Sequence, residues 1–102
     1  MMKYYPGAKP YCEWEYWVSG TLTDPGTTPT CAIYDHKGKY VSASETETTT
    51  KSATGIYYYE GWTIPTTALA GKYTAIAKIT DGDHITRDIT SAVEFEVIKV
   101  GY

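Results

Sequence analysis

The chain has 102 residues, with 9 lysines and arginines against 12 aspartates and glutamates. A chain of this length predicts one domain, spanning residues 1–102, and the small acidic excess argues against nucleic acid or an anionic membrane as a partner. No apolar run is long enough for a membrane helix, and residues 1–10, MMKYYPGAKP, lack the apolar segment of a secretory signal.

The residue composition favours strands over helices. The chain contains 11 tyrosines, 3 tryptophans and many threonines, and no stretch keeps a helical period of apolar residues. Turn signals recur instead, at PGAKP (6–10), DPG (24–26), DHKG (35–38), SATG (52–55) and DGD (81–83). Short strands between such turns predict an all-β protein, a sandwich of about seven antiparallel strands in two sheets.

The expected strands, in chain order, lie near residues 2–5, 11–18, 30–35, 39–50, 56–64, 72–80 and 85–98. The threonine-rich stretch 43–52 lacks large apolar residues and is expected to be a short edge strand or a strand-like loop. The last segment is long for one strand, so we expect a kink near residues 88–91 to divide it.

Alternation of apolar and polar residues assigns the inward faces. The residues expected to point inward are Cys12, Trp14, Tyr16, Val18, Cys31, Ile33, Tyr73, Ala75, Ala77, Ile79, Val93, Phe95 and Val97. Tyr11, Glu13, Glu15 and Trp17 share the opposite, wet face of their strand.

The stretch TGIYYYEGWTIP (54–65) breaks this alternation. Strict alternation would bury Glu60, which is strongly unfavourable for an unpaired carboxylate. An extra residue at Glu60-Gly61 would shift the register by one, and glycine adopts the positive φ that such a bulge often needs. We therefore expect a bulge there, with Tyr58 outside. The residues then expected inside are Tyr57, Tyr59, Trp62 and Ile64.

The segment GKYTAIA (71–77), preceded by Leu69, resembles the Gly-x-Tyr-x-small motif that opens strand F of immunoglobulin-like domains. The wider pattern IYD-x-x-G (33–38), TGIYYYEGWTIP, AGKY (70–73) and FEV (95–97) is similar to bacterial, archaeal and phage immunoglobulin-like modules, including macroglobulin-type domains. The resemblance covers about residues 11–98. It implies that Tyr73 is the corner tyrosine that hydrogen-bonds to nearby backbone, and that Ala75 stands where antibody domains place a cysteine.

Two departures separate this chain from antibody domains. The strand around Ile33 has no tryptophan, and the usual strands hold no inter-sheet cysteine pair. Cys12 and Cys31 begin antiparallel strands of facing sheets, so we place them at opposite ends of the sandwich, too far apart for a disulfide.

Few residues suggest chemistry. His36 and His84 lie in turns that the topology places at opposite ends, so we expect no shared metal site. Asp24, Asp81 and Asp83 are an alternative, a hard-cation site at one end, although no calcium-binding spacing supports it. No serine has a nucleophile-elbow setting, and the carboxylates of 45–47 and 94–96 alternate on exposed faces. We therefore expect no enzyme activity and no cofactor.

The function that we favour is a non-catalytic structural or assembly component of a phage or archaeal-virus virion. The alternatives are a module of a cell-surface or secreted protein and a carbohydrate-binding domain. A virion component implies a virion or cytoplasmic location, and a surface or secreted module an extracellular one. The aromatic residues that would stack on sugar rings are Trp17, Tyr34, Tyr40 and Tyr58.

The outward aromatic residues also suggest a protein interface, because tryptophan and tyrosine often anchor protein contacts. Trp17 and Tyr58 fall on strands expected to be neighbours in one sheet, so we hypothesise that they form one patch that binds a partner protein or a second copy. Tyr34 falls on the other sheet and is an independent candidate.

Overall fold

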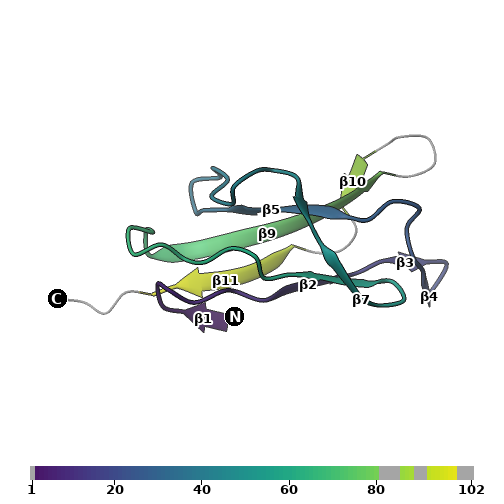
Figure 1. Ribbon diagram of the computed structural model, residues 1–102, viewed down its shortest axis with the longest axis horizontal. Coiled ribbons are helices and arrows are strands. Elements are labelled where there is room, and N and C mark those ends of the chain that lie inside the picture. The colour runs from purple at the N-terminus through teal and green to yellow at the C-terminus, as the bar shows by residue number, and fades with distance from the viewer. Residues whose placement is uncertain (1, 81–85, 89–91, 99–102) are drawn as a thin grey trace.

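The computed structural model describes residues 2–80, 86–88 and 92–98 (Figure 1). In this part of the chain the secondary structure consists of strands, and no helix is long and apolar enough to cross a membrane. The all-β prediction is confirmed, but the described part holds more strands than the seven expected. They are β1 (Met2–Tyr4), β2 (Cys12–Glu15), β3 (Trp17–Val18), β4 (Thr21–Leu22), β5 (Thr30–Tyr34), β6 (Glu47–Thr48), β7 (Thr50–Ala53), β8 (Ile56–Tyr59), β9 (Gly71–Thr80), β10 (Thr86–Asp88) and β11 (Val93–Val97).

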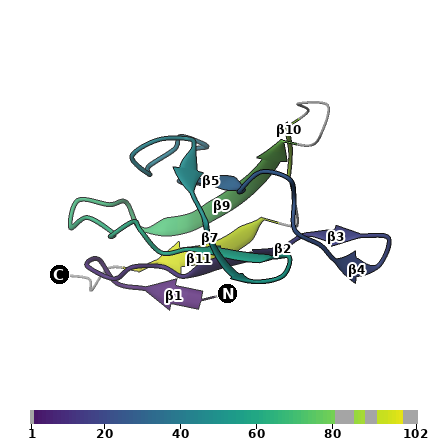
Figure 2. The ribbon, with the colours of Figure 1, turned by 45° about the vertical axis from the view of Figure 1, so that its right-hand side comes forward.

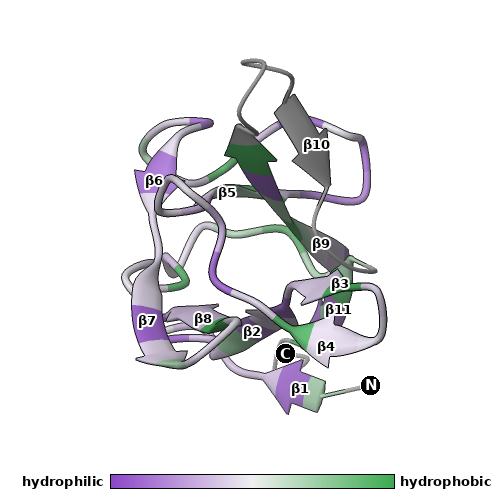
Figure 3. Ribbon diagram, turned by 90° about the vertical axis from the view of Figure 1, so that its right-hand side faces the viewer, coloured by the Kyte–Doolittle hydropathy of each residue, from purple (hydrophilic) through white to green (hydrophobic). Residues whose placement is uncertain are grey.

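The strands form two layers and a small hairpin. A six-stranded sheet has the order β1-β11-β9-β5-β6, with β10 also paired to β9, and a three-stranded sheet has the order β2-β8-β7. Figure 3 shows the two layers end-on, with β7, β8 and β2 below β6, β5 and β9. Every pair is antiparallel except β1 with β11, which is parallel and departs from the expected antiparallel set.

The stretch between residues 43 and 52 changes sheets at Thr49. Its two strands, β6 and β7, lie at the edges of the two sheets among the described strands, as predicted for this polar segment. The Thr49 amide and hydroxyl both donate to the Pro29 carbonyl, at 3.2 and 2.7 Å. Both hydrogen bonds lie where the backbone leaves one sheet for the other, so they satisfy polar groups that the sheets do not pair.

One apolar core lies between the two sheets. Cys12 and Trp14 of the three-stranded sheet meet Ile33, Tyr73 and Phe95 of the six-stranded sheet, and none of the five is more than 2% exposed. On β2, β9 and β11 the inward residues alternate with more exposed ones, and on β5 Cys31 and Ile33 are buried together with Ala32, which is 3% exposed. The predicted inward residues of these four strands thus face the core.

The predicted strand 11–18 ends early. It stops at Glu15, and the chain then forms a hairpin of β3 and β4 that lies beyond β2 at one end of the molecule (Figures 1 and 2). Ser19 and Gly20 join the two strands with φ of 51° and 78°, the two positive values that a tight two-residue hairpin turn requires. Val18 is therefore 43% exposed, and its predicted place in the core is wrong.

The tyrosine run has the predicted faces. Tyr57 is buried at 5% exposure and Tyr59 packs against the core, whereas Tyr58 lies opposite Glu13 on the outer side of the sheet. After β8, Trp62 is half-buried against the core and Ile64 is buried.

Gly61 does not occupy the predicted bulge. The strand β8 ends at Tyr59, so the change of face occurs in a loop, and the register shift of this sheet lies in β7 between Lys51 and Ala53. The φ angle of Gly61 is also not positive. A Cβ on Gly61 would stand 2.9 Å from Cε1 of Tyr59, so the glycine allows a close approach to that ring.

Tyr73 makes the contact expected of a corner tyrosine. Its hydroxyl donates to the Leu69 carbonyl at 2.7 Å, and its ring lies 5.9 Å from the Trp62 ring and 5.7 Å from the Phe95 ring, centroid to centroid. The long C-terminal segment is divided into β10 and β11, both paired to β9. The expected kink falls largely on residues 89–91, which lie outside the described part.

Candidate functional site

An open groove lies on the outer face of the six-stranded sheet. Because Ile33 and Tyr73 point into the core, the residues next to them along β5 and β9 point outward. Two of these, Tyr34 and Thr74, lie opposite each other across the two strands. The groove has a volume of about 540 Å³. It is lined by Tyr34, Asp35, His36, Gly38, Lys72, Thr74 and Ile76.

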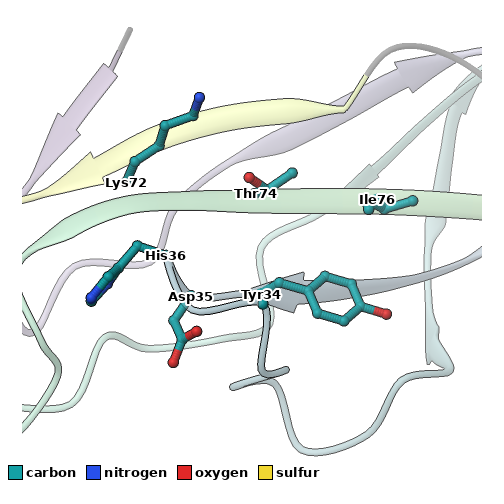
Figure 4. Close-up of a pocket in the computed structure, with 7 residues that line it drawn as sticks. Tyr34, Asp35, His36, Lys72, Thr74 and Ile76 are labelled. Atoms are coloured by element: carbon teal, nitrogen blue, oxygen red, sulfur yellow. The ribbon is translucent and has the colours of Figure 1, made fainter.

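The groove has a polar end and an apolar end. In Figure 4, Lys72, Thr74 and Ile76 follow one another along β9, and the ring of Tyr34 points along the strand towards Ile76. Tyr34 and Ile76 are both half-buried, so each still offers surface to a partner. The Tyr34 hydroxyl donates to the Glu45 carboxylate at 3.3 Å, which orients the ring.

Asp35 serves the turn after β5. Its Oδ1 atom accepts hydrogen bonds from the amides of Lys39 and Lys37, at 3.1 and 2.8 Å, and these bonds hold the pKa of the carboxyl below its usual range. Gly38, with φ of 82°, closes the same turn. An ionised carboxylate already bound by two amides is poorly suited to act as a general base.

His36 and Lys72 form the polar end of the groove. The His36 ring lies against Gly71, whose Cβ position would be 3.2 Å from Nδ1. Lys72 makes an ion pair with Glu94 of β11, and both side chains are largely exposed, so the pair contributes little to stability. Together with the tyrosine, these groups combine an aromatic ring with polar side chains, and none of them is a nucleophile paired with an activating base.

The predicted Trp17–Tyr58 patch is not formed as expected. Trp17 is 52% exposed, but it lies in the β3–β4 hairpin, while Tyr58 lies in the three-stranded sheet. Tyr58 instead stacks on Tyr11, with ring centroids 5.4 Å apart and planes 21° apart. Tyr34 lies on the other sheet, as predicted. Tyr34 and Tyr40 lie opposite each other across a β-bridge, whereas Trp17 lies in the β3–β4 hairpin and Tyr58 in the three-stranded sheet. The four aromatic residues therefore do not share one sheet.

Asp24 is engaged by protein groups. Its carboxylate binds Lys51 Nζ at 2.7 Å, the Gly55 amide at 2.8 Å and the Tyr57 hydroxyl at 3.3 Å, and these bonds, led by Lys51, lower its pKa. Asp81, Asp83 and His84 lie outside the described residues. Within the described part, no three side chains of histidine, cysteine, aspartate or glutamate are grouped to hold a metal ion.

Cys12 and Cys31 are buried free thiols in the core. Burial raises the pKa of both thiols to about 12, and a nearby Cys12 adds to the rise at Cys31. The two residues therefore lie near each other, and their predicted placement at opposite ends of the sandwich is wrong. The prediction assumed long strands whose starts lie far apart, but β2 and β5 have only 4 and 5 residues.

The comparisons with known proteins concern the fold. No protein-family model matches the chain, and no curated protein matches it. Among solved structures, the crystal structure of CopC from Methylosinus trichosporium OB3b is similar with a TM-score of 0.53 and 18% sequence identity, over 95% of this chain and 84% of that chain. A likeness at this identity supports the all-β architecture of the whole described sandwich and transfers no activity.

This comparison contradicts the hypothesis of a virion component. The structure that the chain resembles is that of CopC from Methylosinus trichosporium OB3b, and it gives no support to a virion or cytoplasmic location.

Proposed function

We propose that this chain is a non-catalytic, immunoglobulin-like binding module, and that the groove over β5 and β9 takes a segment of a partner protein. The order of the strands in the two sheets and the hydrogen bond from Tyr73 to Leu69 support the immunoglobulin-like assignment. An extracellular location belongs to the same proposal.

The observation that carries the proposal is the hollow over two central strands. The outer face of a sheet in a sandwich is commonly wet and polar, but here Tyr34 and Ile76 line an open concavity. Tyrosine anchors protein contacts because it buries a large area with few rotors, and the polar end with Lys72 and Thr74 supplies hydrogen-bond donors that fix orientation.

The test is a binding measurement with two groove variants and one control. Ile76→Arg and Tyr34→Ala alter the apolar end of the groove. Val18→Ser is the control. It removes an apolar side chain that is 43% exposed but lies on the β3–β4 hairpin, outside the groove. A photo-crosslinking residue at position 74 in each protein would capture partners from the native extracellular fraction.

We expect the parent and Val18→Ser to crosslink the same partner, and both groove variants to lose it. Equal capture by all four proteins contradicts the groove as the binding site. Loss of binding that follows glycosidase treatment of the fraction would show a sugar, and not a polypeptide, in the groove.

A further inference from the structure

The outer face of the three-stranded sheet is a second, separate surface. In strands β2 and β8, Cys12, Trp14 and Tyr57 point into the core, so the residues that alternate with them point outward. We call this surface the tyrosine–glutamate face. It consists of Tyr11, Glu13, Glu15, Ile56 and Tyr58, with Glu13 opposite Tyr58 and Glu15 opposite Ile56.

The two tyrosines of this face are held in place. Their rings stack at 5.4 Å, and the Tyr11 hydroxyl donates to Oε1 of Glu13 at 2.8 Å. Tyr11 is nevertheless 45% exposed, so an ordered aromatic surface faces outward. Side chains already fixed in this way lose little conformational entropy when a partner binds.

The charged residues among those that define this face are of one sign. Glu13, Glu15 and Glu60 are exposed, and Glu60 lies close enough to Tyr11 to raise the pKa of its hydroxyl, after the larger effect of Glu13. The strands β2, β7 and β8 contain one basic residue, Lys51. Lys51 lies opposite the inward Tyr57 and binds Asp24, so it does not neutralise the face.

We propose that the tyrosine–glutamate face docks a segment of a partner protein that carries arginine or lysine side chains. A guanidinium or ammonium group over the stacked rings gains cation–π attraction, and the flanking carboxylates supply complementary charge. A second copy of the chain is a poor occupant, because the same face repeats the same sign and the chain carries a net charge of -3. This face is on the opposite side of the sandwich from the groove over β5 and β9.

The experiment uses a labelled peptide in which arginine alternates with threonine, and a matched peptide with glutamate in place of arginine. Fluorescence anisotropy measures binding to the full chain at physiological salt. The test variant is Glu13→Gln/Glu15→Gln. The control is Glu94→Gln/Glu96→Gln, which removes the same charge from a strand of the other sheet.

We expect the arginine peptide to bind and the glutamate peptide not to bind. The Glu13/Glu15 variant should weaken binding about tenfold, the Glu94/Glu96 variant less than about twofold, and Tyr58→Ser about two- to fivefold. Since Glu13 orients Tyr11, Glu15→Gln alone replaces the double variant if that one fails to fold.

Equal weakening by the two double variants would show diffuse attraction to an acidic protein and would overturn the proposal. Failure of the parent to bind the arginine peptide would also overturn it. So would the finding that the parent chain is a dimer and the Glu13/Glu15 variant a monomer, because a second copy would then occupy the face. Ile76→Arg should leave this binding unchanged, so the result is independent of the groove.

Discussion

Gly61 lies against the ring of Tyr59, where a Cβ would stand 2.9 Å from Cε1 and 3.0 Å from the hydroxyl oxygen. Real Cβ atoms do not approach ring atoms this closely, so any side chain at position 61 forces the loop or the tyrosine to move. The glycine therefore leaves room for the Tyr59 ring, and it does not supply the positive φ that a bulge would need.

We expect Gly61→Ala to lower the free energy of unfolding by about 1–3 kcal/mol, the usual cost of overpacking. Gly26→Ala is the matched control, because a Cβ there meets nothing within 4 Å. Urea unfolding of both variants measures the difference. Tyr59→Leu should reduce the cost of Gly61→Ala if the ring is the obstacle, and an unchanged cost in that background would point to backbone strain instead.

The alternation of side chains was predictable because it is local. The inward residues of β2, β5, β9 and β11 follow from the sequence of each strand alone, and so does the outward Tyr58. Strand pairing is not local. The stacking of Tyr11 on Tyr58 depends on the register of β2 with β8, which no short pattern specifies.

The groove was only partly predictable for the same reason. Tyr34 was expected to be an independent outward aromatic residue. Its neighbour Ile76 comes 42 residues later in the chain, and the pairing of β5 with β9 brings the two together. The hairpin of β3 and β4 did have a local signal. Ser19-Gly20 is a turn dipeptide, yet the apolar Val18 before it favoured a continuous strand.

The hydrogen bond from the Tyr73 hydroxyl to the Leu69 carbonyl should contribute measurably to stability. Tyr73 is 2% exposed, so Tyr73→Phe leaves a carbonyl without its donor, and we expect a loss of about 1–2 kcal/mol. Tyr5→Phe, at a residue that is 55% exposed, is the control. Equal midpoints of urea unfolding for the two variants would show that the corner bond adds nothing.

Acid should weaken the contact between Asp24 and Lys51. The pKa of Asp24 is lower in the folded chain than in the unfolded one, chiefly because of Lys51 and the Gly55 amide. The resulting stabilisation is present above the unfolded value of about 3.9 and is lost as the pH falls through the lower folded value. Asp24→Asn should therefore be less stable than the parent at neutral pH and should lose less stability on acidification below about pH 4.

Chemical denaturation at neutral and acidic pH tests this, with Lys51→Met as a second variant that breaks the same contact from the other side. An acid limb that is identical in the parent and in Asp24→Asn would assign the pH dependence to other carboxyl groups, Asp35 first among them because its pKa is also lowered.

The buried thiols should make the protein sensitive to alkali. Burial raises the pKa of Cys12 and Cys31 to about 12 in the folded chain. The folded state then binds more protons than the unfolded state, whose thiols ionise near pH 8.5. The stability from this source is complete below about pH 8.5 and falls as the pH rises from there towards about 12.

A thiol reagent at about pH 8 should react slowly with the folded chain and should find two thiols per chain in denaturant without reductant. We retain the prediction that no intramolecular disulfide forms. Rapid reaction of the native chain would contradict the burial of the two cysteines. A count of zero thiols in denaturant from a monomer would show that their proximity in the core has led to a disulfide.

Trp17 tests the separate character of the β3–β4 hairpin. It is 52% exposed, in contrast to Trp14, which is 1% exposed and lies in the core. Trp17→Ser should therefore change the melting temperature little and should remove most of the tryptophan fluorescence that iodide quenches. Trp14→Phe is the opposite case, since it alters the core and should lower the melting temperature.

If Trp17→Ser unfolds the chain, the hairpin packs on the sandwich in solution. If it folds but loses the partner captured at position 74, then Trp17 shares in that interface, and the groove over β5 and β9 is only part of the binding surface.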